Sequence, residues 1–269
     1  MKLTVLMDNN TFIDEYYLGE PAVSYYIEDE GTKILFDAGY SDAFIRNAKA
    51  MNLDLAGLDV IAISHGHIDH TGGLPSLSEN FDTQNIKLYA HPLTFEYKFL
   101  NGLDTGSPLS KEEVSSLYKT YFSKEPVQIS ENIIMLGEIP PRFDFEKRRI
   151  TGTVVIKGQE MPDDNIDDTA LVYKTKDGIY IITGCSHSGI CGIIEYAKEV
   201  CKDTRVLGVI GGFHLLEQDE QLEGTVEYLR KEKIPELYPC HCVSLESKIA
   251  MAKHMPIVEV GVGMEIEWI

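Results

Sequence analysis

The sequence predicts an α/β protein in which helices cover largely buried sheets. Short runs rich in apolar and β-branched residues alternate with helical stretches along all 269 residues. Some of these runs are apolar on both faces, as the strands of a covered sheet must be. Because strands and helices alternate throughout, we expect them to form layers of one α/β architecture.

The predicted strands are short and bounded by turn residues. They lie at residues 1–7, 33–36, 59–64, 86–90, 132–136, 153–157, 170–175, 179–183, 206–210 and 236–238. The first apolar run soon meets Asp8-Asn9-Asn10, so it is a strand and not an export signal. The five cysteines, an odd number, suit a reducing compartment better than a disulfide framework. We therefore expect a cytoplasmic protein.

The predicted helices fall between these strands. They lie at residues 42–51, 110–122, 189–201, 222–231 and 245–253. Ser110 and Glu113 have capping-box spacing, which marks the start of the second helix. The surrounding stretch is rich in aromatic residues, and we expect a helical insertion around 95–125. It could be a lid over a flat ring substrate, an oligomer contact, or an ordinary helical hairpin that buries its aromatics.

The composition is strongly acidic, with 24 Lys and Arg against 43 Asp and Glu, a formal charge of −19. Such a protein repels phosphate backbones and anionic membranes, so we expect neither a nucleic-acid partner nor a membrane partner. No apolar run is long enough to span a bilayer. A small, anionic substrate remains compatible with this charge if metal ions supply local positive charge.

Five predicted strands end in polar, small or metal-binding residues. These ends are 37–39, 65–70, 184–187, 211–214 and 239–242, and they hold six of the eight histidines. In α/β sheets, sites are built at the carboxyl ends of strands. We therefore expect the five ends to meet at one shared edge.

The pattern His65-x-His67-x-Asp69-His70 packs three imidazoles and one carboxylate into six residues. These groups suit Zn, Fe, Mn and Co. A tight loop after a strand can direct alternate side chains to two neighbouring metals, roughly 3.5–4 Å apart. The alternative is a polar surface loop, although burying three imidazoles without partners costs free energy.

The segment 64–73 resembles the signature of the metallo-β-lactamase-fold superfamily, and the preceding Leu35-Phe36-Asp37-Ala38-Gly39 resembles its supporting strand-end aspartate. The resemblance covers nearly the whole chain. It implies a single domain over 1–269, folded as a four-layer αββα sandwich with the site at one edge of its two sheets.

Further segments resemble one branch of this superfamily. They are Asp8-Asn9, 137–140 with Arg142 and Glu146, 184–190, 211–215 and 240–242. This branch includes the archaeal methanopterin-pathway enzyme that joins a dihydropterin to a ribosyl-aminobenzene phosphate, and many members known only as metal-dependent hydrolases. The chain has Val243-Ser244 where that branch has Thr-Gly, and Pro141 is an insertion, so the resemblance leaves the substrate open.

The resemblance also implies roles for single residues. His65 and His67 match ligands of a first metal, and Asp69, His70 and His241 match ligands of a second. Cys185 occupies the usual place of a bridging aspartate, where it could be a thiolate ligand or only a small buried residue. His187 could replace a missing histidine ligand, or it could contact substrate. Asp167 and Asp168 would cap or support the site indirectly.

Three other positions complete the candidate site. His214 could contact substrate or donate a proton, or it could be an ordinary strand-end histidine. Arg142 could bind an anionic group, since its planar fork suits phosphate or carboxylate, or it could be a surface residue. Strand alternation would turn Cys240 and Cys242 away from His241 and into the core.

The resulting functional expectation is a metallo-hydrolase with two divalent ions, zinc first and iron or manganese as alternatives. Asp69 would orient a metal-generated hydroxide that attacks an ester, phosphoester, lactone or amide. One alternative is a pterin-pathway synthase that displaces a metal-held phosphate or pyrophosphate. Another is a metal- or redox-sensing binding protein that uses Cys185, Cys240 and Cys242. Partners would be a small molecule and a second copy in a homo-oligomer.

Overall fold

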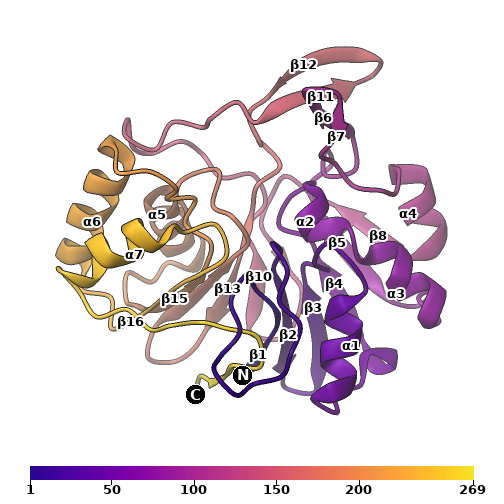
Figure 1. Ribbon diagram of the computed structural model, residues 1–269, viewed down its shortest axis with the longest axis horizontal. Coiled ribbons are helices and arrows are strands. Elements are labelled where there is room, and N and C mark those ends of the chain that lie inside the picture. Colours follow the sequence, from indigo (N-terminus) through magenta and orange to yellow (C-terminus); the bar gives the residue numbers. More distant parts are fainter.

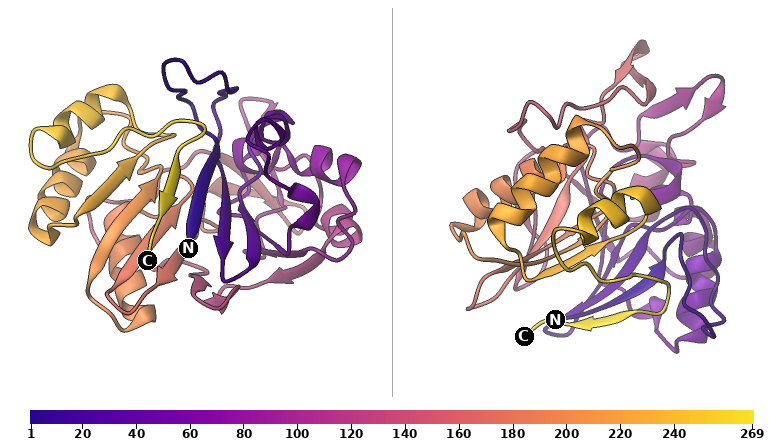
Figure 2. Two further views of the ribbon diagram at one scale, coloured as in Figure 1. Left: turned by 90° about the horizontal axis from the view of Figure 1, so that it is seen from below. Right: turned by 60° about the vertical axis from the view of Figure 1, so that its left-hand side comes forward.

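The computed structural model describes residues 1–269. Two β-sheets pack face to face, and helices cover the outer face of each sheet, so the architecture is the expected four-layer αββα sandwich (Figure 1). The two chain ends lie side by side, and the amino group of Met1 donates to the carbonyl of Trp268 (Figure 2). No helix is both long and apolar enough to cross a bilayer.

The first sheet comes from the N-terminal half and the last strand. Its order is β17 (Glu265–Glu267), β1 (Lys2–Met7), β2 (Ser24–Asp29), β3 (Thr32–Phe36), β4 (Val60–Ala62), β5 (Lys87–Ala90) and β8 (Lys119–Phe122). Strands β3, β4, β5 and β8 are parallel, so the chain must cross over between them. The crossovers contain α1 (Ala43–Ala50), the short η1 (Leu55–Gly57), α2 (Ile68–Thr71), α3 (Leu74–Asn80) and α4 (Lys111–Leu117).

The second sheet comes from the C-terminal half. Its order is β16 (Glu236–Pro239), β15 (Val206–Gly211), β14 (Ile179–Thr183), β13 (Ala170–Lys174), β10 (Ile133–Met135) and β9 (Val127–Gln128). Strands β14, β15 and β16 are parallel and are linked by α5 (Ile190–Cys201) and α6 (Glu220–Glu232). Helix α7 (Leu245–Ala252) follows β16 and lies on the same outer face (Figure 1).

Three apolar clusters fill the three spaces between the four layers. Phe36 and Leu171 belong to the cluster between the sheets, whereas the neighbouring Leu35 packs with Phe44 of α1 on the outer side. Ile181 packs with residues of α5 and α6 in the third cluster. Successive strand residues point to opposite faces, so a strand buried on both faces must be apolar at nearly every position. This explains the continuous apolar runs in the sequence.

A third, four-stranded sheet projects above the sandwich in Figure 1. Its order is β12 (Gln159–Asp163), β11 (Gly152–Ile156), β6 (Tyr97–Leu100) and β7 (Leu103–Asp104). The expectation of a helical insertion around 95–125 is therefore wrong. Ser110 and Glu113 do form the predicted capping box, but the helix ends at Leu117, and 119–122 forms strand β8. The aromatic side chains there favour a strand, and Tyr121 stacks on Tyr89 of β5.

Candidate metal centre

The histidine loop begins where β4 ends. His65 follows Ser64 and is completely buried. At Gly66 a Cβ would lie 2.0 Å from the carbonyl oxygen of Thr94, so only glycine permits this close approach. His67 then caps α2, whose single turn carries Asp69 and His70. The glycine and the short helix together turn the loop so that its side chains face the second sheet.

Asp37 holds this loop from beneath. It follows β3 with a φ of 59° and is completely buried. Its Oδ1 accepts the Ser64 N–H at 2.7 Å, and its Oδ2 lies 2.7 Å from His70 Nδ1. Because Nδ1 is occupied by Asp37, the other ring nitrogen of His70 is directed toward the site. The supporting role expected for Asp37 agrees with these contacts.

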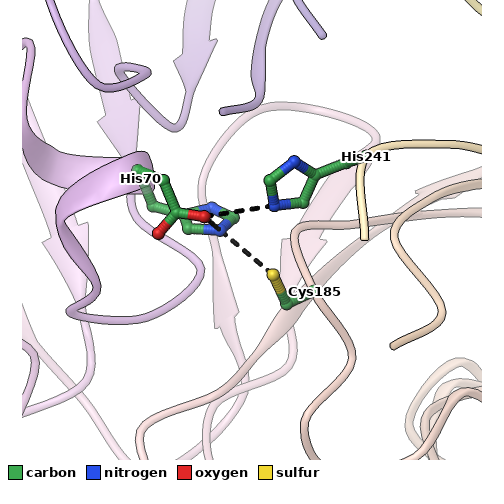
Figure 3. Close-up of side chains that lie close together, drawn as sticks. His70, Cys185 and His241 are labelled. Atoms are coloured by element: carbon green, nitrogen blue, oxygen red, sulfur yellow. Dashed lines mark hydrogen bonds and ion pairs between the residues drawn. The ribbon is translucent and has the colours of Figure 1, made fainter. Parts of the chain in front are cut away.

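One group of potential ligands consists of Asp69, His70, Cys185 and His241, whose donor atoms lie within 4.8 Å of one another. His70 Nε2 is 3.2 Å from Cys185 Sγ, and His241 Nε2 is 3.3 Å from Asp69 Oδ2. Figure 3 shows His70, Cys185 and His241 converging from different segments of the chain. The group joins the end of β4 to the ends of β14 and β16, as the shared-edge argument predicts.

A second group consists of His65, Cys185 and His187, again within 4.8 Å. His67 lies beside it, with its Nδ1 3.0 Å from His65 Nε2 and its ring 5.1 Å from that of His187. Cys185 belongs to both groups. The structure therefore brings together all seven residues proposed as metal ligands, and it places Cys185 between the two sets.

His241 is positioned by the start of the chain. The carboxylate of Asp8 accepts the backbone N–H of His241 at 3.0 Å, and Asn9 Oδ1 lies 3.0 Å from His241 Nδ1. These contacts leave His241 Nε2 directed at Asp69. Asp8-Asn9 stood out in the sequence only as part of a resemblance, and the structure supplies its physical role.

Burial and neighbouring charges hold most of the candidate ligands in the protonation state that binds a metal ion. Burial lowers the pKa of His65 and His187 far below the usual value, and burial followed by the nearby Lys98 lowers the pKa of His67 to about 4. Burial also opposes ionisation of Asp69, but His70 and His241 hold its pKa below the usual range. These imidazoles are therefore neutral and this carboxylate is charged at neutral pH.

The groups present fit divalent ions. His187 Nε2 is buried and has no hydrogen-bond partner, as expected for a nitrogen whose partner is a metal. Although burial lowers it, Asp69 and Asp37 raise the pKa of His70 to about 9, so a cation could replace the proton that this site attracts. Imidazole and carboxylate ligands, with a thiol that a bound metal would deprotonate, favour zinc or iron over magnesium.

A hollow of about 500 Å³ opens onto both ligand groups. Its wall includes His67, Asp69, Cys185, His187 and His214, together with Asn9, Pro21, Thr151, Leu216, His241, Cys242, Val243 and Ser244. The His214 ring lies 4.3 Å from that of His187. Burial, followed by the charge of Arg149, lowers the pKa of His214. His214 is therefore placed beside the ligand groups and not within either of them.

Cys242 requires a correction. It was expected to point into the core, but it lines the hollow, and its Sγ lies 3.4 Å from the carbonyl oxygen of Cys185. Strand alternation does not apply because β16 ends at Pro239 and His241 has a φ of 51°. Cys240 does enter the core, where its thiol meets Tyr25.

Arg142 also requires a correction, because it does not reach the hollow. Its guanidinium pairs with Glu199 near the end of α5. The loop that carries it is fastened to the start of α5 by Glu146, whose carboxylate accepts the backbone N–H groups of Cys191 and Gly192. Arg142 therefore extends along the outside of α5.

A buried ionic group behind the histidine loop was not predicted. Lys98 of β6 is 1% exposed, and its Nζ lies 2.8 Å from Asp167 and 3.2 Å from Asp163. Asp167 Oδ2 in turn accepts the Gly66 N–H at 2.7 Å. Asp168 accepts the Ser188 N–H at 2.8 Å. Asp167 and Asp168 thus support the site indirectly, as expected, whereas a lone lysine in an unpredicted strand gave no sequence signal.

Comparisons with known proteins agree with this geometry. The chain is 28% identical over 263 residues to the 7,8-dihydropterin-6-methyl-4-(beta-D-ribofuranosyl)-aminobenzene-5'-phosphate synthase of Methanocaldococcus jannaschii. The alignment covers 92% of this chain and 89% of that protein. An uncharacterized protein of the same organism is 32% identical and covers 91% of each chain. Both relatives match nearly end to end.

Among solved structures, Tm1679, a metal-dependent hydrolase of the beta-lactamase superfamily, superposes with a TM-score of 0.85 at 28% identity over 100% of this chain and 99% of that chain. Zinc-bound PqqB of Methylobacterium extorquens, at 12% identity and a TM-score of 0.58 over 100% of both chains, shares the fold. Residues 18–241 match the metallo-beta-lactamase superfamily. The chain therefore belongs to the metallo-beta-lactamase superfamily.

Proposed function

We propose that the protein is an enzyme that uses two divalent metal ions to cleave an ester or phosphoester bond of a small, anionic molecule. The observation that carries the proposal is the pair of ligand groups that share Cys185. One group would hold the first ion with His65, His67 and His187, and the other would hold the second ion with Asp69, His70 and His241. Two bound ions would supply Lewis acidity and a water of lowered pKa.

The protein's own residues would orient the reaction. Asp69 is 29% exposed on the hollow and is held charged, so its free oxygen lobe can accept a hydrogen bond from a nucleophilic water. His214 lies on the same wall and could donate a proton to a leaving oxygen. The buried walls around Cys185 and His187 would limit access of bulk water. Zinc is the first choice of metal because the donor set includes the thiol of Cys185, which a bound zinc ion would deprotonate.

A second candidate reaction is a synthase step in which a phosphate or pyrophosphate leaves a dihydropterin. The observation in its favour is the methanopterin-pathway relative, which is similar over 92% of this chain. Both candidates place a small, anionic molecule in the same hollow. The acidic surface, at a formal −19, argues against nucleic acid as the substrate of either reaction.

The test combines metal analysis with two sets of substrates. Protein loaded with zinc, iron or manganese is given a panel of phosphomonoesters, phosphodiesters, lactones and carboxylic esters, and separately a dihydropterin pyrophosphate with a ribosyl-aminobenzene phosphate. We expect turnover that a chelator abolishes and added metal restores. His65→Ala and Asp69→Ala should each lose metal, while His254→Ala, on an exposed residue, should not. Full metal content in both site variants would overturn the proposal.

A further inference from the structure

Two cysteines from different strand ends meet at the candidate metal centre. Cys185 follows β14 and Cys242 follows β16, and Cys242 Sγ lies 3.4 Å from the Cys185 carbonyl oxygen. Gly212 makes this approach possible, since a Cβ there would lie 2.5 Å from Cys242 Sγ and 3.2 Å from Cys185 Cα.

The two thiols differ in their access to small molecules. Both line the hollow, but Cys242 is partly exposed whereas Cys185 is only 4% exposed. The other three cysteines lie elsewhere. Cys191 and Cys201 are on α5, and Cys240 is between the sheets against Tyr25. A reactive molecule that enters the hollow therefore reaches Cys242 more readily than Cys185.

We propose that Cys242 and Cys185 form a peroxide-sensitive thiol pair whose oxidation to a disulfide disables metal binding. The sulfur of Cys242 attacks one oxygen of a hydroperoxide, the O–O bond breaks, and Cys242 sulfenic acid and one water or alcohol form. The sulfur of Cys185 then attacks the sulfenic sulfur, forms the S–S bond and releases water. The two sulfurs together lose two electrons, the peroxide gains them, and both thiol protons end in the released molecules.

The consequence for the metal centre follows from the position of Cys185. It is the member that both ligand groups share, so a disulfide removes one donor from each group at once. A disulfide sulfur is no longer the thiolate that a metal requires. This step rests on the proposed two-metal function, whereas formation of the disulfide does not. Bound metal should in turn protect Cys185 by occupying its sulfur.

The experiment treats metal-free protein with a small excess of hydrogen peroxide and then counts thiols and maps peptides by mass. We expect the count to fall by two from the five free thiols, with a peptide that links 185 to 242. A dithiol reductant should restore both thiols. Oxidised protein should bind zinc or cobalt roughly tenfold or more weakly than reduced protein, measured by competition with a coloured chelator. Prior loading with zinc should slow the oxidation.

Two variants separate the possible outcomes. Cys242→Ser should leave Cys185 without a partner, so no disulfide forms and metal affinity survives peroxide, while Cys201→Ser, on α5, should behave as wild type. Circular dichroism checks that both variants fold. Five intact thiols after treatment, or a disulfide that avoids Cys242, would overturn the pair even if reduced protein binds two metals. A 185–242 disulfide that leaves metal affinity unchanged would overturn the switch.

Discussion

At the scale of single residues, Asp37 decides which nitrogen of His70 faces the site. Its Oδ2 accepts a hydrogen bond from the Ser64 hydroxyl and lies beside His70 Nδ1, each at 2.7 Å. Its Oδ1 accepts the Ser64 N–H. With a proton on Nδ1, Nε2 is the nitrogen that would bind a metal ion once its own proton is displaced. The orientation and the tautomer of this imidazole therefore depend on one buried carboxylate.

The first prediction follows from that dependence. In Asp37→Asn, an amide oxygen that keeps the Ser64 N–H bond turns its NH₂ toward His70, which favours the tautomer with the proton on Nε2. Metal affinity should fall by about 10–100-fold, the usual cost of losing such a supporting contact. Competition with a chromophoric chelator measures it. Asp59→Asn, on an exposed carboxylate that accepts the Lys33 N–H, is the matched control. Equal metal affinities in the two variants would show that Asp37 does not orient His70 for metal binding.

The second prediction concerns Asp168, whose side chain is completely buried and whose pKa is raised by burial to about 6. The folded state holds this proton more tightly than the unfolded chain does, so folding stability falls as the pH rises from about 4 to about 6. In metal-free protein, Asp168→Asn should escape this loss, gaining on the order of 3 kcal/mol relative to wild type between pH 4 and pH 7. Urea unfolding at both pH values measures it. If the difference in unfolding free energy between wild type and Asp168→Asn does not change with pH, then burial does not raise the pKa of Asp168 and this prediction is wrong.

Residues close together in sequence were the easiest to assign. The segment 65–70 carries four of the candidate ligands. The strand-end argument placed Cys185 and His187 near them, and the resemblance gave them their expected roles. Cys242 was misplaced because its direction depends on the left-handed backbone at His241, which no strand pattern reveals. Arg142 was misplaced because the path of its loop is set by Glu146 capping α5. Both errors concern irregular backbone, where side-chain direction has no period.

At the scale of elements, the small third sheet is fastened to the histidine loop. The Ile68 N–H donates to the carbonyl of Thr105 at 2.9 Å, just after β7. Lys98 of β6 neutralises Asp163 at the end of β12, and it also neutralises Asp167, which holds Gly66. The sheet thus supplies a buried cation that keeps this backbone in place.

The third prediction tests this attachment. Lys98→Met leaves two buried carboxylates without their counter-ion, which should destabilise the fold by about 3–5 kcal/mol in urea unfolding. The Gly66 contact should loosen as well, so zinc affinity should fall at the proposed site of His65 and His67. Lys98→Arg should recover much of both losses. Lys87→Met, on an exposed lysine of β5, should change stability by less than about 0.5 kcal/mol. Similar effects at the two lysines would contradict the attachment.

Strands with strong apolar runs were predicted nearly to the residue, whereas only β11 of the third sheet was predicted. Strand β14 matches its predicted range, because Ile179–Thr183 is buried on both faces. Strand β6 is half exposed and only four residues long, so its Tyr97 and Phe99 were read as helical aromatics. Strands of a small sheet that projects from the sandwich lack the two-sided burial that produces a clear sequence pattern.

At the scale of the whole molecule, the site lies between two halves that are built alike. Each half contributes a sheet with parallel strands and outer helices, and the sheets share one apolar cluster. The histidine loop leaves the first sheet at β4, while Cys185 and His241 leave the second at β14 and β16. The layered class was predictable from composition and alternation. The way in which loops of the two sheets face one another required the tertiary structure.

The last prediction follows because the candidate ligands come from both sheets. A metal ion held by ligands from both sheets would bind only the folded chain, so each such ion should stabilise it by about 2.7 kcal/mol at a free metal concentration a hundred times the dissociation constant. For a chain of this size, that corresponds to a rise in Tm of roughly 5–10 °C. Thermal unfolding of chelated and zinc-loaded protein measures it. His241→Ala removes a ligand of the second sheet and should shrink the rise, whereas His254→Ala should preserve it. A zinc-independent Tm would mean that the two strand-end groups do not close around a common metal centre.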